Sequence, residues 1–394
     1  MSGLQKSAMQ ARIAKLPYLP TVAPPYDDEQ DVEEREEAMS TIASLPKMLP
    51  PGPRSVAPKR GLRSVHGPDL SQFSPISASG YFVQAVNIKL EARGIDIRAY
   101  YSPPIVPAGK TIDEPTTVMV CHHGAGYSGL SFACFAKEVV KFSGGECGVL
   151  AFDARRHGKT MPLEGQSDED LDIDTLTRDF IALLSSLFPN PQEASTFLLV
   201  GHSMGGAVCV KACPILQESG YKVGGTAVLD VVEGSALEAL PIMTSLLDSR
   251  PAGFSSVEEA IQWHITSHTI RNAFSARISI PAIFVKSEDG ESDHPWVWRT
   301  PLRSTAPYWT SWFKSLSSRF LACRSARLLV LAGTDRLDKE LMIGQMQGKF
   351  QMEVIPDVGH MLHEDDPSRT AEILVDFWRR NERVVIGVKK VGDL

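Results

Sequence analysis

The chain has 394 residues, of which 43% are hydrophobic, enough to fill one large core with further segments attached. Its formal net charge is −7, which excludes a typical binder of nucleic acid or anionic membrane, because either would need a basic surface. No apolar run approaches the ~18 residues of a membrane-spanning helix, and the N-terminal segment is charged where a secretion signal would be apolar.

The cysteines indicate whether the protein belongs to a reducing or an oxidising compartment. They lie mostly in apolar runs and show no C-x-x-C spacing, so we expect reduced packing thiols rather than a disulfide framework or a zinc site. The positions are Cys121, Cys134, Cys147, Cys209, Cys213 and Cys323. With no secretion signal in the sequence, we expect a globular protein of the cytoplasm, with the nucleus as a second compartment.

Residues 1–75 are predicted to be a disordered or weakly structured tail. Prolines recur on both sides of an acidic run at 27–37. Such a segment cannot bury enough apolar surface to offset the entropy that it would lose on ordering. The folded domain is therefore expected to cover residues 76–394.

From residue 81 the pattern changes to alternating strands and helices. Residues 81–90 and 95–101 alternate in polarity around a Gly at 94, which predicts a β-hairpin. Further strands are predicted at 117–121, 148–152, 197–201, 225–230, 326–332 and 350–355, with helices at 132–142, 171–188, directly after residue 203, and 367–380. Because apolar strands between helices are buried on both faces, the pattern predicts an α/β fold. Its central sheet should be mostly parallel, with ligands at the carboxyl edge.

A long segment at about 235–320 interrupts this alternation. It is rich in aromatic residues, namely Phe254, Trp263, Phe274, Trp296, Trp298, Tyr308, Trp309, Trp312 and Phe313. An insertion at the carboxyl edge of a parallel sheet is placed to cover the site, so we expect a helical lid. Some of the aromatic side chains would line the site, whereas most would hold the lid to the body.

The strongest motif is Gly201-His-Ser-Met-Gly205, a G-x-S-x-G sequence between a predicted strand and a predicted helix. In such a nucleophile elbow the serine adopts a strained backbone conformation, and only small neighbours let the strand and the helix pass each other. Ser203 is therefore the candidate nucleophile.

A serine hydroxyl is a weak nucleophile, so Ser203 needs a histidine base within hydrogen-bond reach and an acidic residue to orient that base. His360 follows the last predicted strand, and Gly359 permits a turn there. This position at the edge of the sheet favours His360 over His363, which would cap or pair locally.

Two aspartates are candidates for the acid. Asp230 ends the strand that follows the elbow helix, and Asp335 ends the strand that follows the lid. Both edges can face a shared base, and chain topology alone slightly favours Asp335.

An oxyanion hole needs two backbone N–H groups directed at the developing negative charge. Met204, directly after the nucleophile, supplies one. The loop at 121–126 supplies the other, with Ala125 as the donor and Gly124 allowing the backbone to approach. No H-E-x-x-H pattern is present, and neither a metal nor a cofactor is predicted.

Six short segments together resemble the protein phosphatase methylesterases. They are VCHHGAG at 120–126, AFDARRHG at 151–158, VGHSMGGA at 200–207, DVVEGS at 230–235, AGTDRLDK at 332–339 and IGQMQGKFQM at 343–352. The first three are general α/β-hydrolase sequences, whereas DVVEG and IGQMQGKFQM are far more specific. The resemblance runs from about residue 80 to 380.

The resemblance implies an α/β-hydrolase fold and a Ser203, His360 and Asp230 triad, so that Asp230 rather than Asp335 is the acid. It also implies a substrate and a partner, the type 2A protein phosphatase catalytic subunit, whose C-terminal leucine methyl ester would be hydrolysed. A small-molecule esterase or lipase is the alternative within the same class. A non-catalytic phosphatase-binding inhibitor or chaperone is the alternative from another class.

The selection of one protein terminus requires a docking surface beyond the pocket, because one methylene in an apolar pocket contributes only about 1–3 kcal/mol. Residues 342–352 mix Met, Gln and Gly in a way that suits an adaptable contact surface. We expect Met346, Gln347, Lys349 and Phe350 to contact the phosphatase. The alternative is a helix-to-strand connection packed on the sheet.

Overall fold

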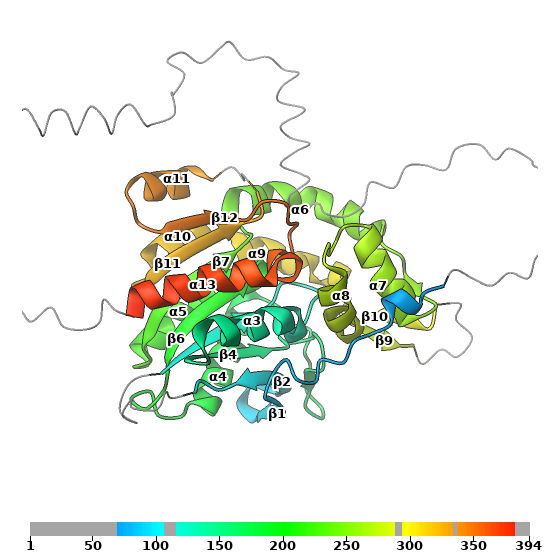
Figure 1. Cartoon of the computed structure of the whole chain (residues 1–394), viewed down its shortest axis with the longest axis horizontal. Coiled ribbons are helices and arrows are strands. Elements are labelled where there is room, and N and C mark those ends of the chain that lie inside the picture. The colour runs from blue at the N-terminus through cyan, green and yellow to red at the C-terminus, as the bar shows by residue number, and fades with distance from the viewer. Residues whose placement is uncertain (1–68, 106–115, 288–293, 334–336, 383–394) are drawn as a thin grey trace, which may run out of the picture. The chain divides into compact units, whose positions relative to one another are not determined.

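The computed structural model describes residues 69–105, 116–287, 294–333 and 337–382 (Figure 1). Most of the predicted tail, residues 1–68, lies outside these ranges. Its described end contacts the lid, where the Ile76 N–H donates to the Arg277 carbonyl at 2.9 Å and the Arg277 Nε–H donates to the Ser74 carbonyl at 2.7 Å. The short 3₁₀ helix Ser71–Phe73 lies in this end of the tail.

A mostly parallel sheet forms the centre of the described fold. Its strands are β1 (Gln84–Leu90), β2 (Ile95–Ser102), β3 (Thr117–His122), β4 (Cys147–Phe152), β5 (Met161–Pro162), β6 (Thr196–His202), β7 (Val223–Leu229), β11 (Ala326–Leu331) and β12 (Gln351–Val354). The order is β1-β2-β4-β3-β6-β7-β11-β12, with β5 on β2. β1 and β2 form the predicted antiparallel hairpin, and the strands from β4 to β12 run parallel.

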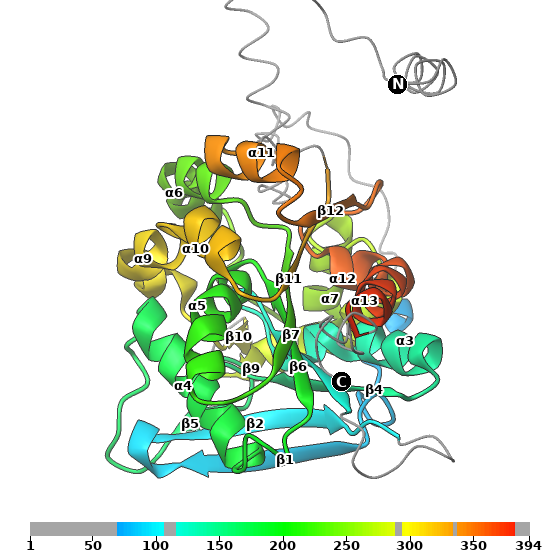
Figure 2. The ribbon, with the colours of Figure 1, turned by 90° about the vertical axis from the view of Figure 1, so that its left-hand side faces the viewer.

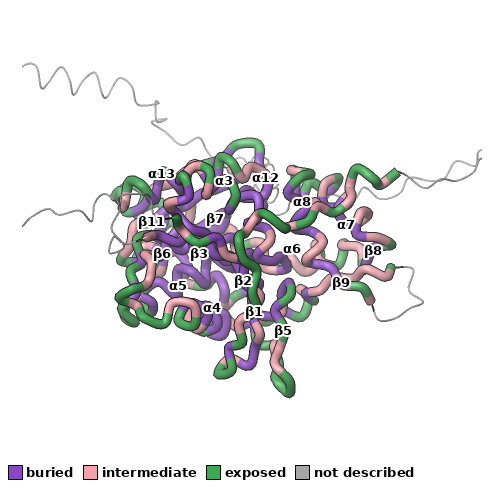
Figure 3. Tube along the Cα trace, turned by 60° about the horizontal axis from the view of Figure 1, so that its bottom comes forward, coloured by how far each residue is buried: buried purple, intermediate pink, exposed green. Residues whose placement is uncertain are grey.

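Helices cover both faces of the sheet, as the continuous apolar strands predict. They are α3 (Ala133–Ser143), α4 (Ile173–Leu187), α5 (Met204–Glu218), α11 (Lys339–Met346), α12 (Leu362–Asp365) and α13 (Pro367–Glu382), with 3₁₀ helices at Glu91–Arg93 and Gly129–Phe132. In Figure 2, α4 and α5 lie on one side of the strands, and α3 and α13 lie on the other. Separate hydrophobic cores fill the two interfaces, and the edge strand β1 is mostly exposed (Figure 3).

The predicted lid lies between β7 and β11. It contains α6 (Glu233–Asp248), β8 (Gly253–Phe254), α7 (Val257–Thr266), α8 (Ala273–Ser279), a 3₁₀ helix (Ile280–Ile283), β9 (Phe284–Lys286), β10 (Trp296–Trp298), a 3₁₀ helix (Leu302–Tyr308), α9 (Trp309–Phe313) and α10 (Leu316–Ala322). The lid is therefore mainly helical, as predicted. It also holds a small antiparallel sheet, β8-β10-β9, that the sequence did not predict.

The lid aromatics divide into two groups. Phe254, Phe284 and Trp298 belong to a hydrophobic cluster inside the lid, where the Phe284 and Trp298 rings lie 4.5 Å apart between centroids. Trp309 and Trp312 instead face the main pocket. This division agrees with the expectation that some of these side chains hold the lid together and others line the site.

Two further expectations from the sequence concern the state of the cysteines and the character of the helices. All six cysteines are buried and free. None of the helices within the described ranges combines the length and the apolar character needed to cross a bilayer.

Candidate active site

Ser203 occupies a sharp turn between β6 and α5. Its φ and ψ are 50° and −120°, a strained conformation for a residue with a side chain. The flanking glycines are needed for close approach. A Cβ on Gly201 would lie 2.3 Å from the Gly205 carbonyl oxygen, and one on Gly205 would lie 2.2 Å from the His122 carbonyl oxygen. The predicted nucleophile elbow is therefore present in the structure.

Asp230 and His360 are hydrogen bonded to each other. Asp230 directly follows β7, and its Oδ2 lies 2.7 Å from His360 Nδ1. The other oxygen, Oδ1, accepts from the Ala332 N–H at 2.8 Å. The side chain of Asp230 is 2% exposed and that of His360 is 25% exposed. The carboxylate therefore fixes the imidazole through Nδ1, and the ring lines the pocket.

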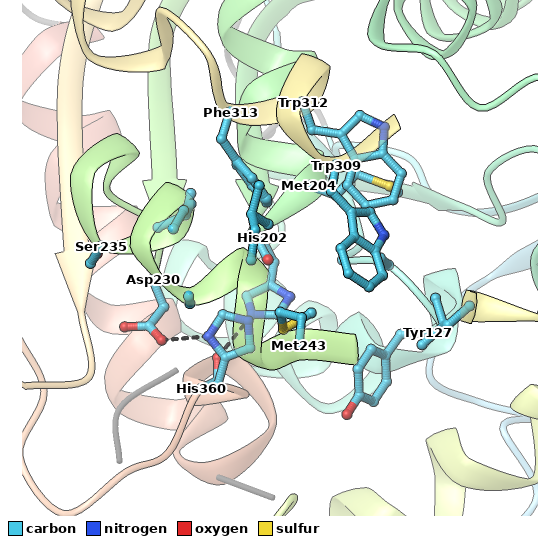
Figure 4. A pocket seen from close by; sticks show the side chains of 18 of the residues that line it. Tyr127, His202, Met204, Asp230, Ser235, Met243, Trp309, Trp312, Phe313 and His360 are labelled. Atoms are coloured by element: carbon cyan, nitrogen blue, oxygen red, sulfur yellow. Dashed lines mark hydrogen bonds and ion pairs between the residues drawn. The ribbon is translucent and has the colours of Figure 1, made fainter. Parts of the chain in front are cut away.

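Ser203 lines the same pocket as Asp230 and His360, which Figure 4 shows facing each other. The described residues that line it include His360 but not His363, which is fully buried and stacks on Phe132 at 4.4 Å between ring centroids. The other candidate acid, Asp335, lies outside the described residues.

The predicted oxyanion donors Ala125 and Met204 line the same pocket. Neither N–H donates a hydrogen bond to another described residue, so both are available to a ligand. A Cβ on Gly124 would lie 2.6 Å from His202 Nδ1 and 3.3 Å from the Ser203 Cβ. A side chain at position 124 would thus fill the space beside the nucleophile.

Buried histidines that sequence reasoning left without a role hold the site in place. His123 Nε2 accepts from the Ala154 N–H, and His157 Nε2 accepts from the Gly126 N–H, each at 2.9 Å. The His123 and His157 rings thereby connect the loop at 121–126, which holds the predicted oxyanion donor Ala125, to the loop after β4. His202 Nε2 lies 2.8 Å from the His360 carbonyl oxygen, and the two rings lie 4.6 Å apart between centroids. In the sequence, the only indication of this role was that His123, His157 and His202 lie within the motifs at 120–126, 151–158 and 200–207.

Burial keeps this group of histidines neutral. It lowers the pKa of His122 and His157 to about 4 and that of His363 to about 3. The pKa values of His123 and His202 also fall well below the usual range, first through burial and then through neighbouring histidines.

These shifts predict a loss of folding stability in mild acid. The folded-state pKa values lie below the unfolded value of 6.5, so the stabilisation is complete above pH 6.5 and is lost as the pH falls toward 4. Each histidine that is protonated only on unfolding contributes roughly 1.4 kcal/mol per pH unit. Asp153, Glu364 and Asp365 act in the opposite direction, because burial raises the pKa of each carboxyl, that of Asp153 to about 6, but these carboxyls are fewer than the buried histidines.

The measurement is urea unfolding at pH 7.5, 6.5 and 5.5. We expect the unfolding midpoint to fall steeply below pH 6.5. The variant His363→Phe, at a site where neither ring nitrogen has a described hydrogen-bond partner, should show a shallower fall. An unchanged midpoint between pH 7.5 and 5.5 would contradict the prediction.

The remainder of the pocket is mostly apolar. Trp309, Trp312 and Phe313 of α9 lie together on one wall of the pocket, and Met243 of α6 and Tyr127 add further walls (Figure 4). The indole N–H of Trp309 donates to Thr305 Oγ1 and that of Trp312 to the Leu171 carbonyl, each at 2.8 Å. Because these rings are fixed, the pocket is preformed for an apolar group.

The predicted partner-binding residues are separate from the pocket. Met346 at the end of α11 is 84% exposed, and Gln347 and Lys349 are also exposed. Phe350 is only 9% exposed and packs against Phe320 at 5.4 Å between centroids, so its side chain offers little surface to a partner in this structure. Phe350 directly precedes the edge strand β12, and its side chain belongs to the hydrophobic core.

Comparisons with known proteins agree with this geometry. The alpha/beta hydrolase family model matches residues 119–373. Protein phosphatase methylesterase 1 of Cryptococcus neoformans var. neoformans is 44% identical over 405 residues, which cover 96% of this chain and 93% of the relative. The protein of the same name from Aspergillus oryzae is 40% identical over 415 residues, covering 100% and 93%.

A solved structure supports the fold alone. E-2-(acetamidomethylene)succinate hydrolase superposes with a TM-score of 0.56 at 16% identity, over 75% of this chain and 100% of that one. From the extent of the sequence identity and the family match, the chain belongs to the protein phosphatase methylesterases within the alpha/beta hydrolase family.

Proposed function

We propose that this protein is a serine carboxylesterase that removes the methyl ester from the C-terminal leucine of the type 2A protein phosphatase catalytic subunit. The observation that carries the proposal is the 2.7 Å hydrogen bond between Asp230 and His360 in the pocket that Ser203 also lines. Membership of a methylesterase family supports the class of reaction.

In the first half-reaction Ser203 Oγ attacks the ester carbonyl carbon, and His360 Nε2 accepts the hydroxyl proton. The charge of Asp230 stabilises the resulting imidazolium. The N–H groups of Met204 and Ala125 stabilise the oxyanion. When the tetrahedral intermediate collapses, His360 returns the proton to the departing methoxide, so methanol leaves and an acyl-enzyme remains.

In the second half-reaction His360 deprotonates a water molecule, which attacks the acyl-enzyme. The second tetrahedral intermediate uses the same N–H groups. As it collapses, His360 returns the proton to Ser203 Oγ and a free C-terminal carboxylate leaves, so the net reaction consumes one water and produces one methanol. No metal or cofactor takes part in any step.

The apolar walls suit a leucine side chain at the reacting end. Trp309, Trp312 and Phe313 provide apolar surface in the pocket that His360 also lines, and hydrogen bonds fix the two indole rings. Complete burial of a leucine side chain contributes about 1.5–3 kcal/mol, enough to hold the terminus but not to select it from other C-termini.

The test is demethylation of methylated phosphatase holoenzyme, measured as methanol release, beside hydrolysis of p-nitrophenyl acetate. We expect both activities. Hydrolysis of the small ester without demethylation would favour a small-molecule esterase. Phosphatase binding without either hydrolysis, and without labelling of Ser203 by a fluorophosphonate, would favour the non-catalytic alternative.

The docking surface is assigned to α11. Met342 is 51% exposed, Ile343 44% and Met346 84%, so apolar side chains gather on the surface of one helix. Gln347 and Lys349 continue this surface toward β12. Such an adaptable apolar surface with a polar edge suits contact with the folded body of a protein substrate.

Met346→Asp is expected to lower kcat/KM for phosphatase demethylation by roughly 10-fold or more, because a charge would replace a central apolar contact. Hydrolysis of p-nitrophenyl acetate should be unchanged, since Met346 lies outside the pocket. The matched control is Met161→Asp, at a methionine that is 56% exposed on β5. Equal loss of both activities, or loss of neither, would remove α11 from the docking surface.

A further inference from the structure

The main pocket contains a cation that the proposed triad does not use. Arg250 follows α6 and lines the pocket together with Ser203 and His360. Its Nε is buried and has no hydrogen-bond partner among the described residues. Within the same residues it forms no ion pair.

The guanidinium group is nevertheless held in place. Its central carbon lies 4.8 Å from the centre of the Trp298 ring, a cation–π contact. The Trp298 indole N–H donates to the Pro251 carbonyl at 2.8 Å, which fixes the ring. Arg250 is therefore presented on a rigid surface.

The pocket offers Arg250 no anion of its own. Among the described residues that line it, Asp230 is the only carboxylate, and both of its oxygens are already bonded. Burial raises the pKa of the Tyr127 phenol, so that group stays neutral. Burial also lowers the pKa of Arg250, but a guanidinium remains charged at neutral pH.

An unpaired cation in an apolar cavity is stable only while water reaches it. A substrate that fills the pocket displaces this water, and the desolvation cost then falls on the guanidinium unless the ligand supplies an anion. Carboxylate is the anion whose geometry matches the planar fork of an arginine.

We propose that Arg250 is a carboxylate-binding residue of the substrate pocket. The inference rests on the esterase activity proposed above and deepens it by naming the chemistry of the ligand. The carboxylate has two sources. It is either an acidic side chain upstream of the C-terminal ester or the C-terminal carboxylate that hydrolysis creates.

The first experimental arm uses short peptides that end in leucine methyl ester. They carry either Asp or its neutral isostere Asn at each of the three preceding positions. If the source is an acidic side chain, the enzyme with Arg250 should prefer Asp at one position by about 10- to 100-fold in kcat/KM, the range of a charged hydrogen bond. Arg250→Met should abolish that preference and leave hydrolysis of the Asn peptides nearly unchanged.

The second arm measures inhibition by the free-acid form of the Asn peptides. If the source is the product carboxylate, the acid should inhibit the enzyme with Arg250, and Arg250→Met should raise Ki by about 10-fold or more. The ester series should then show no preference for Asp. Arg250→Lys keeps the charge but loses the planar fork, so it should recover part of whichever effect appears.

Arg303→Met is the matched control, because Arg303 is a lid arginine that pairs with Asp248 and lies outside the residues that line the pocket. It should leave both arms unchanged. The inference is overturned if Arg250→Met affects acidic and neutral esters equally and leaves Ki unaltered.

Two further measurements separate failure of the proposed role of Arg250 from failure of the esterase proposal and from misfolding of the variant. If the unmodified enzyme hydrolyses neither p-nitrophenyl acetate nor any peptide ester, the esterase proposal fails rather than the role of Arg250. If Arg250→Met does not fold, as judged by its thermal unfolding, the Asp and Asn series and the free acids are compared with the unmodified enzyme and Arg250→Lys. Absence of any Asp preference and of any inhibition by the free acid would then overturn the inference.

Discussion

Ser203→Ala is expected to lower kcat for ester hydrolysis by roughly 10⁴-fold or more, as the loss of a triad nucleophile does. The variant removes one hydroxyl that faces the pocket and changes no volume in the core. The strained turn should also persist, because it is held by the close passage of Gly201 and Gly205 against neighbouring backbone. We therefore expect an unchanged thermal unfolding midpoint and unchanged binding to the phosphatase.

The matched control for this variant is Ser235→Ala, which removes another serine hydroxyl from the residues that line the pocket. It should retain most of the activity with p-nitrophenyl acetate. A fluorophosphonate should add its mass to the unmodified protein and to Ser235→Ala, but not to Ser203→Ala. Turnover by Ser203→Ala within about 10-fold of the unmodified enzyme would refute the serine mechanism.

The central fold was predictable because its signals are local. Continuous apolar runs such as Thr117–His122 read directly as strands buried on both faces, and the structure buries every residue of that strand. The small lid sheet has strands of only two or three residues, too short for any periodicity to develop. Its pairing depends on how the lid packs, which no single segment encodes.

The same distinction applies to the site. Ser203 and the glycines around it lie within one motif, so their geometry follows from a short segment. The burial of Phe350 could not be predicted, because an apolar residue near Met346 looks the same in sequence whether it faces solvent or Phe320. Arg250 carries no local signal, since its environment arises only when Trp298 folds back beside it.

The order of the strands in the sequence could not decide which aspartate is the acid. β7 and β11 are adjacent and parallel, so residues that end either strand reach the same edge of the sheet. Topology alone favoured Asp335, and only the family resemblance indicated Asp230. In the structure the Asp230 N–H donates to the Val330 carbonyl at 2.8 Å, and Asp230 Oδ1 accepts from the Ala332 N–H, which directs Oδ2 at His360.

Asp230→Asn is accordingly expected to lower kcat by about 10³- to 10⁴-fold, with little change in stability. The amide oxygen can still accept from the Ala332 N–H, whereas the amide NH₂ would face His360 Nδ1 as a donor. The ring would then carry its proton on Nε2, the nitrogen that must accept the proton of Ser203, and the imidazolium would lose its counter-charge.

The comparison that decides the acid is Asp335→Asn, measured in parallel with p-nitrophenyl acetate and with methylated phosphatase. An aspartate outside the triad contributes at most to local stability, so this variant should retain activity within about 10-fold of the unmodified enzyme. The acid is identified by which of the two variants loses more activity, because both replacements are isosteric and remove one negative charge. A larger loss for Asp335→Asn than for Asp230→Asn would show that the bond between Asp230 and His360 positions the ring without supplying the catalytic charge.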